Sequence, residues 1–525
     1  MNCRYWGLII TFALLGIVPV ATAQQSGGGQ GQPAQTGQQS GGQTSSPNPN
    51  ATGQSGGGSS NPQAGPTSGQ GARQGGQIGG PPSAGRPGLT STITGAQQLP
   101  GAAQVTPGPS TLSLEQAIGL AIQNNLTTLL ARERRHEAEG LRQESRAGLL
   151  PNISGTAYQA NITLNIAALG FQPGTFPGIS NTFLGPFNNF DARARLVQNI
   201  FDLSAIRNYQ AGRAGVRVAA LQEELAREQV ATFTALTYLE ALRSDRSVGA
   251  AQANVELARS LLKLAEDQRA AGVATGVDVT RAETRLAQEE VRLAQAQTSS
   301  DQARLNLQRV VGLQLESPLT LSDELRFTDE TFPAPEAAVA QAGESRREVR
   351  IAEEQLKLSG LERRAVEAEN LPSLEFVGDY GVSGITPTNT DLPTRRAAIQ
   401  LNVPVFNGGL TRGRLTVATS RERQAELELG SVRGQVEEDV RLALVTLRTA
   451  VVQVRATDET VRLAQRELEM SQDRFRAGVA DNLEVVNAQT ALANARDAQV
   501  SALAQYNAAR LNLAASLGRA EAFRW

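Results

Sequence analysis

The sequence is poor in the residues on which most catalytic and metal centres are built. Its 525 residues include one cysteine, one histidine and only 4% aromatic residues. A single histidine leaves little basis for a histidine-based catalytic triad or for most transition-metal sites. It lies at His136 within the charged segment RERRHEAE, where we expect an exposed helix position. Residues 111–525 contain no G-x-S-x-G motif, whose one match lies in the Gly-rich segment 53–57, and the chain has no phosphate-binding loop; we therefore predict no catalytic residues, no metal site, no cofactor and no enzyme.

The chain also lacks an excess of charge of either sign. The chain has 49 basic and 51 acidic residues, a net charge of −2, and the two kinds are interleaved along the sequence. A nucleic-acid-binding surface needs clustered basic residues, so we predict no nucleic-acid partner. After the N-terminal segment, uncharged apolar runs of about 18 residues or more, which a transmembrane helix requires, are absent as well.

The N-terminal region is predicted to be an export signal followed by a tether. Arg4 precedes the apolar run Gly7 to Val20, and Ala21-Thr22-Ala23 has the form of a signal-peptidase site, so residues 1–23 are assigned to a signal peptide. Cys3 would leave with it. Residues 24–110 consist almost entirely of Gly, Gln, Ser, Pro, Thr and Ala, which cannot bury enough apolar surface to fold. We interpret them as a disordered tether.

The most informative feature that is present is a repeat. The segment DQRAAGVATGVDVTRAETRLA begins at Asp267, and DRFRAGVADNLEVVNAQTALA begins at Asp473 without a gap in the alignment. The motif ARLNL follows in the same register in both copies. We therefore divide the remainder into a first repeat, residues 111–330, and a second repeat, residues 331–525.

Each repeat is predicted to contain a helix followed by two strands. In the first, the helical pattern runs from Ser113 to Pro151 and alternating runs cover 153–166 and 192–201, with a Phe-rich loop at 171–190 between them. In the second, Leu371-Pro372 ends a helix. Alternation then begins at 374–377, and a turn-rich stretch at 381–393 leads to the last run, 397–406. This makes four strands in two pairs.

Very long helices are predicted after each strand pair, over 205–269 and 410–475, because both segments lack proline and are rich in Ala, Leu, Arg, Glu and Gln. Each would be on the order of 100 Å long and must lie along other helices. The second contains a heptad seam: Leu444, Leu447, Val451, Val454, Val461, Leu468 and Phe475. Each helix then turns at an AGVA motif and returns to about Gly312 or Gly518, which makes a helical hairpin.

Four alternating strands cannot close into a membrane barrel, since the smallest such barrels have about eight. The sheet of this chain therefore either stays outside the membrane, as a fragment of a β-sandwich, or combines with sheets of other copies. An open edge cannot lie in hydrocarbon.

The order and duplication of these elements resemble the TolC-like outer-membrane efflux proteins. The resemblance covers residues 111 to 520 and is carried by LSLEQAIGLAIQNN, the Leu-Pro pairs, VPVFNGGLTRGRL, RFRAGVADNLEV and ARLNLAASLG. It implies a mainly α fold with a small β part, in which duplicated hairpins of three protomers form an α-helical barrel. That barrel continues into a 12-stranded transmembrane β-barrel with four strands per protomer.

The resemblance also implies the function: an exit channel in the cell outer membrane, with a large periplasmic part, of a tripartite efflux or type I secretion system. It would conduct substrates passively as a homotrimer surrounded by outer-membrane lipid. Its partners would be a periplasmic membrane-fusion adaptor and an inner-membrane pump of the RND or ABC type. A periplasmic coiled-coil adaptor and a structural spacer protein are the alternatives, although neither needs two strand pairs.

The repeated turns would be hairpin tips that dock onto the adaptor. The residues assigned to docking by the resemblance are Gly272, Val273, Thr275, Asp278, Gly478, Val479, Asp481 and Leu483. The alternative is that the glycines and valines only make the turns and that Asp278 and Asp481 only cap helices. Both interpretations can hold together.

The resemblance further places a pore constriction at Phe475, Glu484 and Asn487. Glu484 and Asn487 share one helical face, and three copies of Glu484 around an axis would attract cations. Relatives often carry a second acid where this sequence has Asn487, so a double acidic ring is in doubt. Phe475 has an alternative interpretation as the residue that ends the heptad seam.

Overall fold

The computed structural model describes residues 99–106, 111–170, 183–329, 332–388 and 392–524. The predicted signal peptide, most of the predicted tether and the predicted boundary between the repeats, at 330 and 331, lie outside the described residues. So does the first part, 171–182, of the predicted Phe-rich loop.

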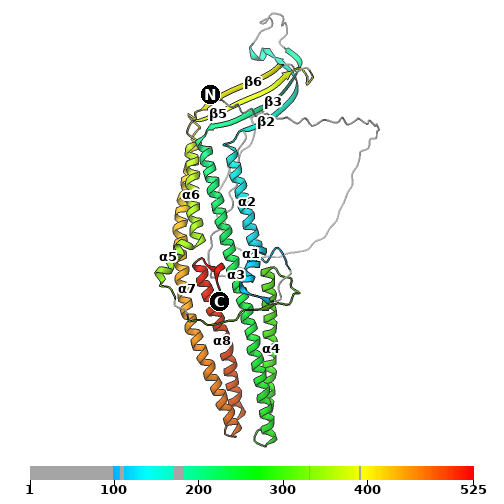
Figure 1. The fold of residues 1–525 in the computed structure, drawn as a ribbon, viewed down its shortest axis with the longest axis vertical. Helices are drawn as coiled ribbons and strands as arrows, with labels where there is room; N and C mark the ends of the chain where they lie inside the picture. The colour runs from blue at the N-terminus through cyan, green and yellow to red at the C-terminus, as the bar shows by residue number, and fades with distance from the viewer. Residues whose placement is uncertain (1–98, 107–110, 171–182, 330–331, 389–391, 525) are drawn as a thin grey trace, which may run out of the picture. The chain divides into compact units, whose positions relative to one another are not determined.

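The same order of elements occurs twice: two helices, two strands and two helices (Figure 1). The first set is α1 (Leu114–Asn124), α2 (Leu126–Ala147), β2 (Asn152–Asn165), β3 (Phe183–Phe201), α3 (Leu203–Ala270) and α4 (Gly276–Val311). The second set is α5 (Pro335–Ser345), α6 (Arg347–Ala368), β5 (Ser373–Gly384), β6 (Leu392–Asn402), α7 (Leu410–Arg476) and α8 (Asn482–Ser516). A parallel two-residue pair, β1 (Thr111–Leu112) and β4 (Thr320–Leu321), and two short 3₁₀ helices, Ile166–Leu169 and Ala520–Ala522, complete the described elements.

The long hairpins are confirmed. Helices α3 and α7 have 68 and 67 residues, and each is followed by a shorter return helix, α4 or α8. The predicted seam of α7 is buried at Leu444, Leu447, Val454, Leu468 and Phe475, where it packs mainly against α8. Many of the facing α8 residues are alanines, which allow two helices of this length to approach closely.

The predicted helix 113–150 is two helices, because the chain breaks at Asn125. The Asn125 backbone is extended, and its side chain accepts a hydrogen bond from the amide of Thr127 at 2.9 Å, which caps α2. The side-chain Nδ2 atom of Asn125 donates to the carbonyl of Pro100 at 2.8 Å. Asparagine competes with helical hydrogen bonding in this way, and the apolar periodicity on both sides concealed the break.

The strand limits also differ from the prediction. Strand β3 begins at Phe183 because the second part of the Phe-rich stretch pairs with β2, with Phe187 opposite Ile162. Strand β5 continues to Gly384, through glycines that suggested a turn. At Gly381 a Cβ atom would lie 2.4 Å from the carbonyl oxygen of Ala192, so this glycine permits close approach of β3. Strand β6 ends at Asn402, before Pro404, which has no amide to donate.

The strands form one antiparallel sheet in the order β2, β3, β5, β6. The helices below it are neighbours in the order α2, α3, α6, α7, and farther along in the order α4, α3, α8, α7. The sheet lies at one end of the long helices and both hairpin turns lie at the other (Figure 1). The strands and the two sets of neighbouring helices thus form three rows. One edge of these rows is β2, α2 or α4, and the other edge is β6 or α7.

Residues 99–106, which were assigned to the tether, are hydrogen bonded to the first hairpin and to the break between α1 and α2. The amide of Ala103 donates to the carbonyl of Asn124 at 2.8 Å, and the amide of Thr106 donates to that of Gly312 at 2.8 Å. The folded part of the chain therefore includes these residues. Composition did not indicate this, because backbone groups make most of the contacts.

Substitution of Gly312 tests the attachment of residues 99–106 to the first hairpin. The φ of Gly312 is +83°, and a Cβ atom there would lie 2.5 Å from the carbonyl oxygen of Gln104 and 2.7 Å from Ala102 Cβ. We expect Gly312→Ala to cost about 1–2 kcal/mol for the left-handed backbone and about 1–3 kcal/mol more for the overlap.

Gly272→Ala is the matched control, since φ is +75° there but a Cβ would meet nothing within 4 Å. Thermal unfolding followed by circular dichroism should show the lower midpoint for Gly312→Ala. Equal midpoints would contradict the attachment.

Candidate functional site: the hairpin tips

Both tips begin with the glycine turn that the repeat predicted. Gly272 and Gly478 have φ of +75° and +70°, and each comes directly after the C-cap residue of its helix, Ala271 for α3 and Ala477 for α7. The amides of Val273 and Val479 donate to carbonyls five residues earlier, at Gln268 and Arg474. These bonds satisfy the last turn of each helix, so the glycines are required by the turn itself.

The first tip is held by a capping box. The hydroxyl and the amide of Thr275 donate to Asp278 Oδ2 at 2.7 and 2.9 Å, and Arg281 lies 3.7 Å from the same carboxylate. The bonds from Thr275 lower the pKa of Asp278 below its ordinary value. The cap is therefore present at pH values above an ordinary carboxyl pKa, and it is lost as pH falls through the lowered pKa of Asp278.

The second tip is capped differently. Asp481 accepts the amide of Glu484 at 3.3 Å, and the Glu484 carboxylate is 3.2 Å from Arg474 at the end of α7. The interpretation of Asp278 and Asp481 as helix-capping residues is thus confirmed. Docking by these tips remains a prediction.

Apolar side chains are exposed on both tips. Val273, Val277, Val479 and Leu483 are each between 45% and 71% exposed. In a soluble protein isolated exposed side chains need no explanation, but here they gather at two turns that also lie against each other. Such a surface is suited to docking.

The two tips are joined by a residue that we did not single out as a site residue. Asn482 is 3% exposed, and its Nδ2 atom donates to the backbone carbonyl of Asp278 at 2.7 Å. Gln268 Nε2 adds a longer bond of 3.5 Å to the carbonyl of Arg476. The aligned position in the first copy is Gly276, which has no side chain to make such a bond. Comparison of the two copies contained this signal.

The predicted constriction residues occupy different environments. Asn487 is exposed and Glu484 is partly exposed, on the first turns of α8. Phe475 is 5% exposed and packs with Leu468, Val485 and Leu261, so its interpretation as the end of the heptad seam is confirmed. Of the three predicted constriction residues, Glu484 and Asn487 are accessible in this chain and Phe475 is buried.

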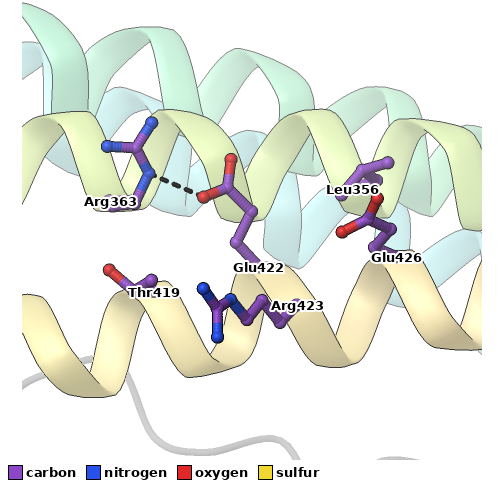
Figure 2. Close-up of a pocket in the computed structure, with 6 residues that line it drawn as sticks. All are labelled: Leu356, Arg363, Thr419, Glu422, Arg423 and Glu426. Carbon is purple, nitrogen blue, oxygen red and sulfur yellow. Dashed lines mark hydrogen bonds and ion pairs between the residues drawn. The ribbon is translucent and has the colours of Figure 1, made fainter.

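Among the described residues no group of three or more His, Cys, Asp or Glu side chains could hold a metal ion. A hollow of about 530 Å³ between α6 and α7 is lined by charged and polar side chains, and Arg363 bonds Glu422 across it (Figure 2). Leu356 is its only apolar lining residue among those described. Ligand pockets are mostly apolar, so this hollow is a gap between two helices. Among the described helices, none is both long and apolar enough to cross a bilayer.

A small antiparallel sheet joined to two hairpins of this length defines a class of proteins that link strands to a helical shaft. The profile of the family described as outer membrane efflux protein matches residues 117–313 and 338–519. These segments cover well over half of the chain, so the protein belongs to this family of outer-membrane channels. Its location is the outer membrane, with a large periplasmic part.

Individual relatives are distant. The chain is 27% identical over 325 residues to the alkaline protease secretion protein AprF of Pseudomonas aeruginosa, and the match covers 59% of this chain and 65% of AprF. It is 22% identical over 350 residues to outer membrane protein TolC of Escherichia coli, covering 63% and 70% of the two chains. The match to AprF, at 65% of its length, thus spans slightly less than two thirds of that protein. The CmeC channel of Campylobacter jejuni has the same fold, with a TM-score of 0.67, 17% identity and coverage of 78% of this chain and 86% of CmeC.

Asn482→Ala should loosen the two tips from each other, because it removes the bond to the Asp278 carbonyl. Spin labels at positions 277 and 483, which are exposed, would report this change by double electron–electron resonance. We expect a broader distance distribution than in the parent protein. Asn487→Ala, at an exposed asparagine on the same helix, is the control and should leave the distribution unchanged.

Proposed function

We propose that this protein is the outer-membrane exit channel of a tripartite efflux or type I secretion system, and that three copies form it. The observation that supports this best is that the two edge strands of the sheet in one protomer are suited to pair with each other between copies. The sheet ends on β2 and β6, which run in opposite directions, so β6 of one copy can pair with β2 of the next in the antiparallel order of the sheet. Repeating this step closes a barrel with no unpaired strand edge.

The helices at the same edges carry apolar stripes. On α7 five exposed residues lie on the side of the helix opposite its buried seam: Leu427, Val445, Val452, Leu463 and Met470. On α4 an exposed seven-residue repeat lies opposite its buried side: Val277, Thr284, Val291, Thr298 and Leu305. Each stripe faces away from its own row. Helix α7 of one protomer and α4 of the next can therefore form a seam like the one between α7 and α8.

The proposed partners follow from the two ends of the molecule, the hairpin tips and the sheet. The tips would dock onto a periplasmic membrane-fusion adaptor through their exposed apolar side chains, and an inner-membrane pump of the RND or ABC type would supply energy and cargo. Outer-membrane lipid would surround the sheet. The name of AprF concerns protein secretion, so polypeptide cargo is included in this proposal along with small molecules. The channel itself would conduct passively, with Glu484 and Asn487 near its periplasmic end.

Val452→Glu tests the assembly. It places a charge in the proposed seam between protomers without touching the protomer core, because Val452 is 67% exposed in the single chain. We expect loss of the trimer on native gels of detergent-extracted outer membranes. Gln453→Glu, on an adjacent exposed face of α7, is the control and should remain trimeric. A parent protein that runs as a monomer from a soluble fraction would refute the proposal itself.

Glu484→Gln tests the constriction. Arg474 partly neutralises this carboxylate, so we expect a modest change: a fall of about twofold in the cation-to-anion permeability ratio, measured from reversal potentials in planar bilayers. Glu283→Gln, at an exposed position of the first hairpin, should have no effect. An unchanged ratio in Glu484→Gln would remove the acidic constriction and leave the channel proposal intact.

A further inference from the structure

The two faces of the sheet differ in exposure and in chemistry. One face carries Ile153, Tyr380, Ile399 and Leu401, which are 63–74% exposed. On the other face Asp191, Val377 and Gly381 are buried within the single protomer. Side chains crowd together on the inner side of a curved sheet and spread apart on the outer side. The first face, which carries these large apolar side chains, is therefore convex, and the second is concave.

Charged residues of the paired strand positions lie almost entirely on the concave face. Alternation from the register places these on it: Asp191, Arg193, Arg195, Glu375, Asp379 and Arg396. Among the paired positions of the described strands, Arg395 is the single charged residue on the convex face. A strand with one lipid-facing and one water-facing side has this pattern.

Three of these residues lie in one row across the sheet. Arg195 of β3 is opposite Asp379 of β5, and Asp379 is opposite Arg396 of β6. Since neighbouring strands are about 4.8 Å apart, the two arginines are about 10 Å from each other. We call Arg195 and Arg396 the arginine row. Glu375, four residues from Asp379, lies about 13 Å nearer the helices.

The nearby carboxylates are already engaged by a different arginine. Arg193 forms a bidentate contact with Asp191, and its Nη1 atom is 3.5 Å from Asp379 Oδ1. Neither Arg195 nor Arg396 has an ion pair or a side-chain hydrogen bond among the described residues, and both are exposed. Asp191, Arg193, Asp379, Arg195 and Arg396 together leave one positive charge per protomer, carried by exposed guanidinium groups.

We propose that the arginine row is an anion-selecting belt on the inner wall of the channel, which favours anionic cargo as it crosses the outer membrane. This rests on the proposed channel, since assembly of three sheets would bring six such guanidinium groups to one level. Guanidinium groups bind phosphate and carboxylate in paired hydrogen bonds, and rings of arginine act as anion filters. The belt has the opposite sign to Glu484 at the tips, so the two ends of the channel select differently.

The test is the permeability ratio of chloride to potassium in planar bilayers. A gradient near 20 mM salt is used because the Debye length at low ionic strength is comparable with a channel radius. The double variant Arg195→Gln/Arg396→Gln should lower the ratio at least about twofold, and Arg195→Lys/Arg396→Lys should keep it. Arg395→Gln removes one positive charge per protomer from the convex face of β6, the strand that also carries Arg396, and is the control for face.

A second measurement needs no variant. Tripolyphosphate added on the extracellular side should reduce the current of the parent channel at lower concentration than when it is added on the periplasmic side, because the belt lies in the sheet.

The outcomes separate the two proposals. No conductance in the parent protein overturns the channel itself. Conductance with an unchanged ratio in the glutamine double variant, an equal change in Arg395→Gln, or no sidedness of the tripolyphosphate effect overturns the belt and leaves the channel standing.

Discussion

The backbone groups along the outer sides of β2 and β6 are the constraint on which the rest of the structure depends. Inside one protomer the sheet stops at these strands, and such an edge cannot lie in hydrocarbon. The helices at the same edges also have unpaired surfaces, since α7 and α4 each carry a stripe of exposed side chains on the side that faces away from the neighbouring helices. A protomer with matching open edges over its whole length is suited to cyclic assembly. The proposed channel satisfies both edges at once.

Duplication provided two copies of one architecture, and local divergence gave them different contacts. Both repeats break a helix with one extended residue, Asn125 or Arg346. Asn125 is satisfied by backbone groups, whereas Arg346, which is 2% exposed, binds Glu348, Asp439 and the Ser516 carbonyl. At the tips Asn482 replaces the glycine of the first copy and joins the hairpins. The backbone plan is shared, and side chains at equivalent positions decide how the copies are linked.

Much of the candidate site was predictable because it depends on neighbours in sequence. The turn glycines, the capping roles of Asp278 and Asp481, and the burial of Phe475 in its seam all follow from spacing over a few residues. The bond from Asn482 to Asp278 joins positions 204 residues apart, and the arginine row depends on the register of three strands. No local pattern contains such information, although the exchange of Gly276 for Asn482 pointed toward it.

By itself the sequence determined the class of fold: four strands in two pairs, two hairpins about 100 Å long, and their turns. Helix periodicity and capping are local, so they can be read from a single chain. Only the tertiary structure decided where β3 and β5 begin and end, that residues 99–106 attach to the hairpin base, and which sheet face is concave. These depend on backbone hydrogen bonds between distant segments, and such bonds form with little regard to the side chains that a sequence displays.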